Sequence, residues 1–190
     1  GKQFMDVVSK VLLHEGIDAI IYNQPITTPA ISLAAKELNC GLGVIITASH
    51  NPATYNGYKL KGAFGGPLLA KSIEEIEELI PDEISYDFEE FSNESAQEVD
   101  LKKLYLDNIH AAFDIEAIRN SGLNISYDAM YGSGQFIVRE LFPDADLYRC
   151  EWNPTFYGIN PEPILKNLGA YQKHVKETPS IDFGLVNDGD

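Results

Sequence analysis

The sequence predicts an α/β fold with mixed, mostly parallel sheets and flanking helices. Segments with apolar residues at helical spacing alternate with short, β-branched apolar runs. This order favours parallel strands joined by right-handed crossovers. An acidic, polar stretch over residues 81–100 interrupts the alternation, which then resumes. We therefore expect two domains, residues 1–98 and residues 99–190, which meet within that stretch.

The first predicted domain begins with a helix over residues 2–15, whose apolar residues share one face and which Gly16 ends as a C′ glycine. A strand is predicted over 17–22. The next helix starts with Thr28 as N-cap and Pro29 in the first helical position, and a strand over 44–47 follows it. The segment Ser72-Ile73-Glu74-Glu75 is a capping box, which predicts the start of an acidic helix.

The second predicted domain opens with a helical pattern from Leu101 and a shorter helix that ends at Gly122. The turn Gly132-Ser133-Gly134 leads from a strand into a helix. The expected elements in chain order are a strand over 123–128, that helix, a strand over 145–149, a proline-punctuated loop over 154–163, a helix over 164–175 and a strand over 181–186.

Composition excludes some classes of partner. The formal charge is −15, from 14 basic and 29 acidic residues. A nucleic-acid binder needs a basic face to neutralise phosphates, and an anionic membrane surface would repel this chain. No apolar run reaches membrane-spanning length. Cys40 and Cys150 lie far apart in the sequence and fit two reduced thiols, so we expect a cytoplasmic protein.

One polar loop follows the predicted strand over 44–47. It carries Ser49 and His50, and Asn51-Pro52 stops any helix at this point. Lys59 follows a few residues later. Ligands of open α/β sheets bind beyond the carboxyl ends of the strands, so this loop is a candidate site.

The residue types alone leave the role of this loop open. Ser49 and His50 are neighbours in an extended loop and point to different sides, and no Gly-x-Ser-x-Gly motif surrounds Ser49. A serine after a strand is also an ordinary turn or cap residue, and a lone histidine is commonly structural. Lys59 and Lys61 alternate with apolar residues, which is typical of a solvated strand face.

The chain ends in a short acidic loop, Asp188-Gly189-Asp190, after the last predicted strand. Two carboxylates around a glycine suit a hard cation such as Mg²⁺. Aspartate and glycine are also common turn residues, so the pattern alone allows both interpretations. It is not an EF-hand loop, because the remaining ligand positions of that motif are absent.

Four segments together form a more specific pattern. They are Thr47-Ala48-Ser49-His50-Asn51-Pro52 with Tyr55-Asn56-Gly57-Tyr58-Lys59, then Asp128-Ala129-Met130-Tyr131-Gly132-Ser133-Gly134, then Phe156 with Asn160-Pro161-Glu162-Pro163, and finally the segment from Asp182 to Asp190. In this order they resemble the signatures of the α-D-phosphohexomutase family, which includes phosphoglucomutase and phosphomannomutase. The resemblance covers nearly the whole chain.

The resemblance implies a truncated domain 1 and a truncated domain 2 of a four-domain mutase. The first strand of domain 1 would precede residue 1, and residue 190 would fall inside the metal-binding loop. A third aspartate of that loop, the sugar-recognition loop and the phosphate-binding loop would all follow residue 190. We therefore expect the isolated chain to have no mutase activity.

The resemblance also implies roles for individual residues. Ser49 would carry the transferable phosphoryl group. Asp188 and Asp190 would bind Mg²⁺ together with an oxygen of the Ser49 phosphate. Lys59 corresponds to a lysine that transfers a proton or contacts phosphate, and His50 to the adjacent active-site histidine. The choice between His50 and Lys59 as the group that transfers the proton stays open.

The implied reaction interconverts hexose 1-phosphate and hexose 6-phosphate through a hexose 1,6-bisphosphate. Thr47 favours glucose or mannose as the sugar, and phosphoglucosamine mutase is the alternative within the family. A non-catalytic module that binds phosphosugars or metal is an alternative of another class. A serine hydrolase is disfavoured because the nucleophile motif is absent. The sequence leaves the oligomeric state open.

Overall fold

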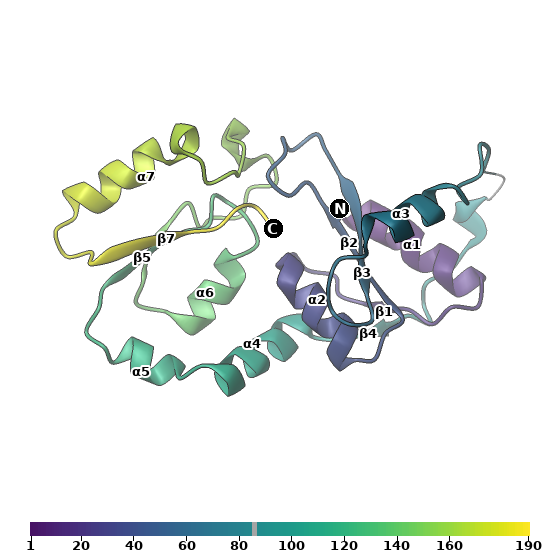
Figure 1. Cartoon of the computed structure of the whole chain (residues 1–190), viewed down its shortest axis with the longest axis horizontal. Coiled ribbons are helices and arrows are strands. Elements are labelled where there is room, and N and C mark those ends of the chain that lie inside the picture. Colours follow the sequence, from purple (N-terminus) through teal and green to yellow (C-terminus); the bar gives the residue numbers. More distant parts are fainter. Residues whose placement is uncertain (85–86) are drawn as a thin grey trace. The chain divides into compact units, whose positions relative to one another are not determined.

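The structure is a computed structural model that describes residues 1–84 and 87–190 and separates into two compact units (Figure 1). Unit 1 contains residues 1–24, 31–46 and 58–101. Unit 2 contains residues 25–30, 47–57 and 102–190. Residues 85 and 86, which belong to the predicted junction, lie outside the described residues. The division after residue 98 stays a prediction.

The described residues of the first half of the chain form three α-helices and four strands. In chain order they are α1 (Lys2–His14), β1 (Ile20–Ile21), α2 (Thr28–Glu37), β2 (Leu42–Thr47), β3 (Gly57–Gly62), α3 (Ala70–Glu77) and β4 (Gln97–Glu98). β1 pairs in parallel with β4, and β2 pairs with β3. Part of the predicted junction is therefore a strand of unit 1, and a short 3-10 turn, Phe88–Glu90, precedes it.

Two predictions in this half are wrong. The predicted capping box at Ser72 does not form, because α3 begins at Ala70 and its N-cap, Leu69, makes no side-chain cap hydrogen bond. Lys61 is not on a solvated face, since only 9% of the residue is exposed. A Cβ at Gly43 would lie 3.3 Å from the Cβ of Lys61, so the lysine stem packs on β2.

The second half of the chain forms a three-stranded parallel sheet in unit 2, which confirms the predicted parallel pairing. Its order is β6-β5-β7, and Tyr127 lies opposite Leu147 on one side and Leu185 on the other. The elements are α4 (Leu101–Ala112), α5 (Ile115–Arg119), β5 (Ile125–Asp128), α6 (Gln135–Leu141), β6 (Asp146–Tyr148), α7 (Leu165–Glu177) and β7 (Phe183–Val186).

Helices cover both faces of this sheet (Figure 1). On one face, Tyr171 of α7 donates a hydrogen bond to Ser126 Oγ of β5 at 3.1 Å. On the other face, Tyr127 packs with Val138 of α6. Successive strand residues point to opposite faces, which explains why these neighbours meet different helices. Beyond α6, the core continues into α4 and α5 through Ile115, Ile137, Leu141, Tyr105, Leu106 and Ile109.

A polar network joins β5, β6 and α7 next to this core. Asp146 Oδ2 accepts a hydrogen bond from Ser126 Oγ at 2.7 Å and lies 2.7 Å from His174 Nε2. Partial burial acts to raise the pKa of Asp146, but the hydrogen bonds with Ser126 and His174 outweigh it. The pKa of this carboxyl is therefore lowered.

The lowered pKa of Asp146 predicts a pH-dependent stability. A carboxylate with a lowered folded-state pKa stabilises the fold above its unfolded-state pKa, and that contribution is lost as the pH falls through the folded-state value. Asp146→Asn should therefore lower the Tm at neutral pH, and the difference from the unmodified protein should shrink below about pH 4. Thermal melting across pH tests this. The exposed neighbour Asp144 provides the control, and equal effects of Asp144→Asn and Asp146→Asn would contradict the prediction.

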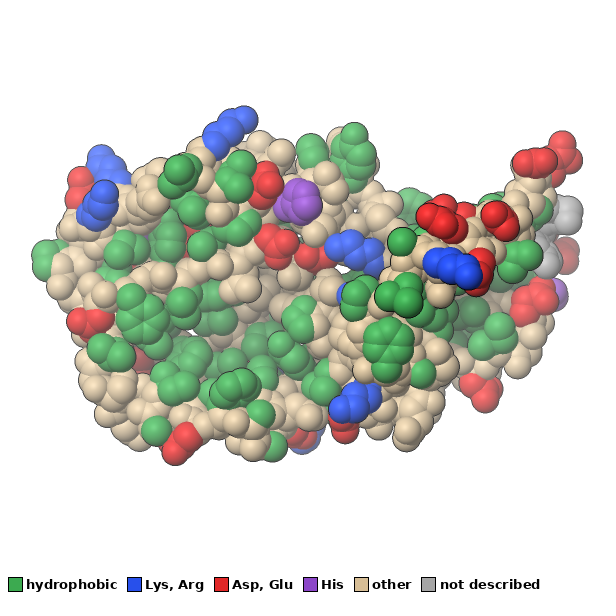
Figure 2. All heavy atoms as spheres, viewed as in Figure 1, with side chains coloured by type: hydrophobic (Ala, Val, Ile, Leu, Met, Phe, Trp, Pro, Cys, Tyr) green, Lys and Arg blue, Asp and Glu red, His purple; other side chains and the backbone are tan. Residues whose placement is uncertain are grey.

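Large hydrophobic side chains also lie on the surface, and Figure 2 shows them spread over the visible face of unit 2. They include Phe183 and Leu185, which are 36% and 46% exposed on one side of β7, an edge strand of the described sheet. Adjacent apolar side chains on an edge strand are a surface that another chain or domain can cover. Among the described helices, none combines the length and apolar character needed to cross a membrane.

Candidate functional site

The loop that follows β2 holds Ser49 in a specific conformation. Ser49 has a φ of 51°, in the left-handed region that is unfavourable for residues other than glycine. Its backbone N–H donates to Thr47 Oγ1 at 2.8 Å, and the N–H of Asn51 donates to the carbonyl oxygen of Ala48 at 2.9 Å. These bonds stabilise a tight turn with Ser49 inside it.

Asp190 contacts three hydroxyl groups of unit 2. Its Oδ1 accepts a hydrogen bond from Ser49 Oγ at 3.1 Å. Its Oδ2 accepts bonds from Thr28 Oγ1 at 2.9 Å and from Thr47 Oγ1 at 2.8 Å. All four residues are assigned to unit 2, although Ser49 and Asp190 are 141 residues apart in the sequence. The structure thus brings the predicted phosphoserine loop and the predicted acidic loop together.

Backbone contacts hold the acidic loop in place. The N–H of Gly189 donates to the carbonyl oxygen of Pro161 at 3.1 Å, and the N–H of Ser133 donates to the carbonyl oxygen of Gly189 at 3.1 Å. A Cβ at Gly189 would lie 2.8 Å from Pro161 Cγ and 2.9 Å from the carbonyl oxygen of Ser49. The bend between Asp188 and Asp190 therefore needs glycine for steric reasons.

Gly132 makes an equally close approach, which gives a prediction. A Cβ at this residue would lie 2.6 Å from both the Cα and the carbonyl oxygen of Gly189. Gly132→Ala should therefore lower the free energy of unfolding by about 1–3 kcal/mol, because backbone atoms would have to move.

Gly169 in α7 is the matched control for Gly132. It is exposed, and a Cβ there would meet nothing within 4 Å. Gly169→Ala should raise the free energy of unfolding by about 0.5–1 kcal/mol, because alanine is the better helix former. Urea unfolding of both variants measures the two changes, and a stable Gly132→Ala variant would show that the approach of Gly132 to Gly189 is not tight.

A buried ion pair between Asp128 and Arg149 lies at the carboxyl end of β5. Asp128, at the end of β5, has a fully buried side chain, and the side chain of Arg149 is 7% exposed. Arg149 Nε lies 2.9 Å from Asp128 Oδ1 and 3.1 Å from Oδ2, and the guanidinium also donates to Oδ2 through a second nitrogen. Burial lowers the pKa of Arg149, but the hydrogen bonds to Asp128 outweigh it, so the pKa is raised.

This ion pair connects to the acidic loop through the backbone. Asp128 Oδ1 accepts a bond from the N–H of Met130 at 2.8 Å, at the start of the turn that leads to Gly132. The carbonyl oxygen of Asp128 accepts a bond from the N–H of Asn187 at 3.2 Å. Asp128 therefore supports the turn that contacts Gly189 and, through Asn187, the acidic loop itself. The sequence reasoning missed Arg149, although its place at the end of the strand after Asp128 was a usable signal.

The other predicted site residues are placed less specifically. Asp188 is half-buried, and His50 is exposed. Lys59 is half-buried in β3 and belongs to unit 1. The structure therefore joins Ser49 to Asp190. The roles of all five residues, Ser49, His50, Lys59, Asp188 and Asp190, stay predictions. Thr28 is a further residue that the sequence reasoning missed, since it was assigned only a capping role.

The donor set suits a small hard cation. Every group that contacts the Asp190 carboxylate through the bonds above is an oxygen, and Mg²⁺ is commonly held by one or two carboxylates together with phosphate oxygens and waters. Two buried hydroxyls near this loop, Ser133 Oγ and Thr27 Oγ1, have no hydrogen-bond partner among the described residues. No cluster of three or more His, Cys, Asp or Glu side chains that could hold a metal occurs in the described part of the chain, so a cation here would need further oxygen ligands.

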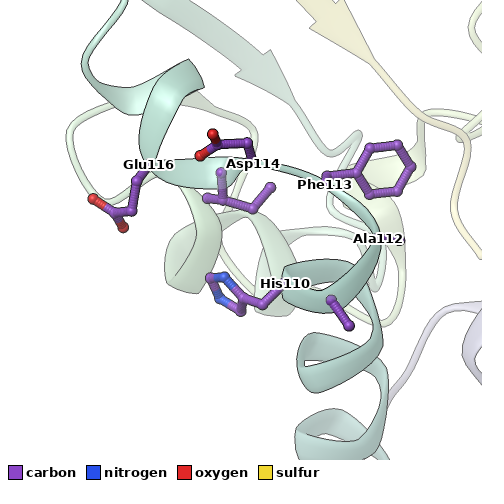
Figure 3. Close-up of a pocket in the computed structure, with 7 residues that line it drawn as sticks. His110, Ala112, Phe113, Asp114 and Glu116 are labelled. Atoms are coloured by element: carbon purple, nitrogen blue, oxygen red, sulfur yellow. The ribbon is translucent and has the colours of Figure 1, made fainter.

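A hollow of about 400 Å³ lies at the turn between α4 and α5 (Figure 3). None of the predicted site residues lines it. Its polar side chains, His110, Asp114 and Glu116, are exposed, and Asp114 accepts the cap hydrogen bond from Ala117 N–H. This hollow therefore offers no chemistry comparable to the site around Ser49.

Comparison with known families gives two matches. The model for phosphoglucomutase/phosphomannomutase, alpha/beta/alpha domain I, matches residues 1–87, and the model for domain II matches residues 103–190.

Individual relatives agree with these matches. The phosphoglucomutase/phosphomannomutase of Thermococcus kodakarensis is 32% identical and aligns with 100% of this chain and 42% of its own length. The phosphoglucosamine mutase of Staphylococcus saprophyticus is 32% identical over 87% of this chain and 37% of its own length. A crystal structure from Thermus thermophilus, described as a phosphomannomutase, superposes with a TM-score of 0.83 at 31% identity, over 98% of this chain and 43% of that one. The chain thus spans about two fifths of these relatives.

The fold and the site define an α/β protein in which a serine loop meets an acidic loop beyond the strand ends. The chain belongs to the phosphoglucomutase/phosphomannomutase family and corresponds to its domains I and II. The predicted family and the predicted α/β fold class are confirmed.

Proposed function

We propose that this chain is the N-terminal part of a phosphosugar mutase that interconverts hexose 1-phosphate and hexose 6-phosphate, with glucose or mannose as the sugar. The observation that carries the proposal is the hydrogen bond from Ser49 Oγ to Asp190 Oδ1 at 3.1 Å. This bond joins the proposed phosphorylated residue to the proposed metal loop. Membership of the family, in which relatives bear the names of such mutases, supports the same conclusion.

The proposed reaction is a reversible phosphoryl transfer. The bond between Ser49 Oγ and phosphorus breaks while a sugar hydroxyl oxygen forms a new bond to that phosphorus. The hydroxyl proton passes to a base, and Ser49 Oγ regains a proton. The resulting hexose 1,6-bisphosphate returns its other phosphoryl group to Ser49 by the reverse steps. In-line positioning and charge stabilisation supply most of the catalysis in such transfers.

Asp188 and Asp190 are the proposed ligands of Mg²⁺, together with an oxygen of the Ser49 phosphate. When bound, the ion neutralises charge on the phosphate oxygens and makes the phosphorus more electrophilic. The contact of Asp190 with Ser49 and the all-oxygen surroundings support this assignment. The part given to Asp188 rests on its place two residues before Asp190 and on the resemblance to the family.

His50 and Lys59 are the proposed groups for proton transfer and phosphate contact. Kinetics of Lys59→Met and His50→Gln variants can separate the two roles. A variant that lacks the proton-transfer group should lose kcat and one limb of its pH profile, whereas loss of a phosphate contact should mainly raise KM. Unchanged kinetics in both variants would remove both residues from the proposal.

The decisive experiment follows a phosphoryl group to one residue. The full-length protein is treated with phosphatase, incubated with glucose 1,6-bisphosphate and Mg²⁺, and mapped by peptide mass spectrometry. One phosphoryl group on Ser49, lost again on addition of excess glucose 1-phosphate or glucose 6-phosphate, is the expected result. A protein that turns over sugar phosphate while it carries the group on another residue, or on none, would overturn the proposal.

Phosphoglucosamine mutase is the second candidate function, because relatives with that name match this chain at 32% identity. The comparison needs kcat/KM of the full-length protein for glucose 1-phosphate, mannose 1-phosphate and glucosamine 1-phosphate. The proposal expects the first two to exceed the third. A clear preference for glucosamine 1-phosphate would change the proposed substrate and leave the proposed site residues unchanged.

The isolated chain is expected to show no measurable turnover, because it spans only about two fifths of the relatives it matches. A coupled assay with glucose 1-phosphate and glucose 1,6-bisphosphate tests this, and measurable glucose 6-phosphate would contradict it. Retained binding of Mg²⁺ without turnover would make the isolated chain a non-catalytic metal-binding module. This result would leave the function of the longer protein unaffected.

A cytoplasmic location and the absence of nucleic-acid and membrane partners also stay predictions. They rest on the net charge of −15 and on the two free cysteines. Burial raises the pKa of the Cys150 thiol to about 11, so this side chain is held in its unreactive protonated form. The oligomeric state stays open.

A further inference from the structure

Thr47 contacts both elements of the proposed site. Its hydroxyl accepts a hydrogen bond from the backbone N–H of Ser49 at 2.8 Å and donates one to Asp190 Oδ2 at 2.8 Å. A hydroxyl group has one donor and two acceptor positions, so both bonds can form at the same time. Thr47 therefore links the backbone of the proposed phosphorylated residue to the side chain of the proposed metal ligand.

Thr28 adds a second bond to the same carboxylate oxygen. It lies at the start of α2, and its Oγ1 donates to Asp190 Oδ2 at 2.9 Å. Hydrogen bonds to an ionised carboxylate are stronger than those between neutral groups. Two such bonds on Oδ2 restrict rotation of the carboxylate and turn Oδ1 toward Ser49 Oγ, which lies 3.1 Å away.

Phosphorylation of Ser49 would change its interaction with the Asp190 carboxylate. Phosphorylated Ser49 has no Oγ proton, so it cannot donate to Asp190 Oδ1. The phosphate group adds a charge of about −1.5 to −2, which repels the neighbouring carboxylate. The bonds from Thr28 and Thr47 to Oδ2 do not involve the Ser49 proton. They can therefore hold the carboxylate near the phosphate when the Ser49 bond is lost.

We propose that Thr47 and Thr28 are positioning residues, which hold the Asp190 carboxylate beside phosphorylated Ser49 so that its Oδ1 is available to a divalent cation. This inference rests on the proposed function. It assigns both threonines a role that differs from helix capping and from sugar preference. Removal of a group that hydrogen-bonds to a metal ligand and orients it commonly lowers metal affinity by about 10- to 100-fold.

The test uses the full-length protein with Ser49 phosphorylated, and Mn²⁺ as a paramagnetic probe whose binding is followed by electron paramagnetic resonance. Thr47→Val removes the hydroxyl but keeps the side-chain shape, and Thr47→Ser keeps the hydroxyl. The same pair of substitutions is made at Thr28. Thr178→Val is the control, because the Thr178 hydroxyl donates to the carbonyl oxygen of His174 and not to Asp190.

Thr47→Val and Thr28→Val are expected to weaken Mn²⁺ binding by about 10-fold or more, whereas the serine variants should stay within about threefold of the unmodified protein. With hexose phosphate as substrate, the valine variants should lose kcat with little change in KM. The control variant should change neither quantity. Thermal melting identifies any variant that fails to fold. If the valine variant at Thr47 or at Thr28 fails to fold, the variants at the other of these two threonines provide the test.

The outcomes separate this inference from the proposed function. If the unmodified phosphorylated protein binds Mn²⁺ and both valine variants bind it equally well, the positioning role is wrong and the proposed function stands. If the unmodified protein takes up no phosphoryl group on Ser49 or binds no Mn²⁺, the positioning role and the proposed function are both overturned. Valine and serine variants with equal losses would also contradict the inference, because the hydroxyl would not be the cause.

Discussion

Ser49→Ala is expected to lower the mutase turnover of the full-length protein by at least about 10³-fold, because the variant has no oxygen to carry the phosphoryl group. The loss should appear in kcat and in kcat/KM, since Ser49 takes part in the chemical step itself. The fold should survive, because the substitution removes one side-chain hydrogen bond to a carboxylate, worth about 1.5–3 kcal/mol. Steady-state kinetics with glucose 1-phosphate and glucose 1,6-bisphosphate measure the change.

Ser180→Ala is the matched control, because Ser180 is an exposed serine of unit 2. It should retain the turnover of the unmodified protein, and the Tm of Ser49→Ala should lie no more than about 10 °C below that of Ser180→Ala. If Ser49→Ala retained most of its turnover, Ser49 would not be the phosphoryl carrier. If the Tm fell strongly for Ser49→Ala alone, the loss of turnover would be assigned to unfolding. Phosphoryl uptake on Ser49 of the unmodified protein would then decide whether Ser49 is the phosphoryl carrier.

Arg149→Met is expected to have the largest effect on stability, a loss of about 3–5 kcal/mol in the free energy of unfolding. The variant leaves the Asp128 carboxylate fully buried without its partner cation. A buried unpaired charge costs far more than the net value of the pair that it belonged to. Urea denaturation measures the change, which should appear as a lower midpoint at an unchanged slope.

Two further variants isolate the cause of this loss. Lys103→Met breaks an exposed pair with Asp107, in which the side chains are 69% and 61% exposed, and should cost no more than about 0.5 kcal/mol. Adding Asp128→Asn to Arg149→Met removes the buried charge and should recover part of the stability. A loss below about 1 kcal/mol for Arg149→Met, or no recovery in the double variant, would contradict this account of the ion pair.

Much of the fold could be predicted because its signals are local. Apolar residues at helical spacing and short β-branched runs identified α1, α4, α7 and the strands of unit 2. The φ of +75° at Gly16 confirms the predicted end of α1, because only a residue without a Cβ adopts that conformation easily. One failure is local as well. Ser72 matched a capping box, but Ala70 already begins α3.

The candidate site was predicted only in part. Ser49 and Asp190 were chosen from separate motifs, and the structure places them 3.1 Å apart. The contact between Thr28 and Asp190 had no sequence signal, because 162 residues separate them. Lys61 shows the same limit, since alternation along one strand cannot reveal what packs on it. Such contacts depend on which segments meet in space.

The sequence by itself therefore determined most of the order of helices and strands, the family, and the two loops that carry the serine and the aspartates. These features depend on neighbours within a few residues, where spacing and turn chemistry act. Only the tertiary structure decided that Thr28, Thr47 and Ser49 share one carboxylate, and that Arg149 neutralises Asp128 beneath the acidic loop. Hydrogen bonds and ion pairs act over a few ångströms in space, whatever the distance along the chain.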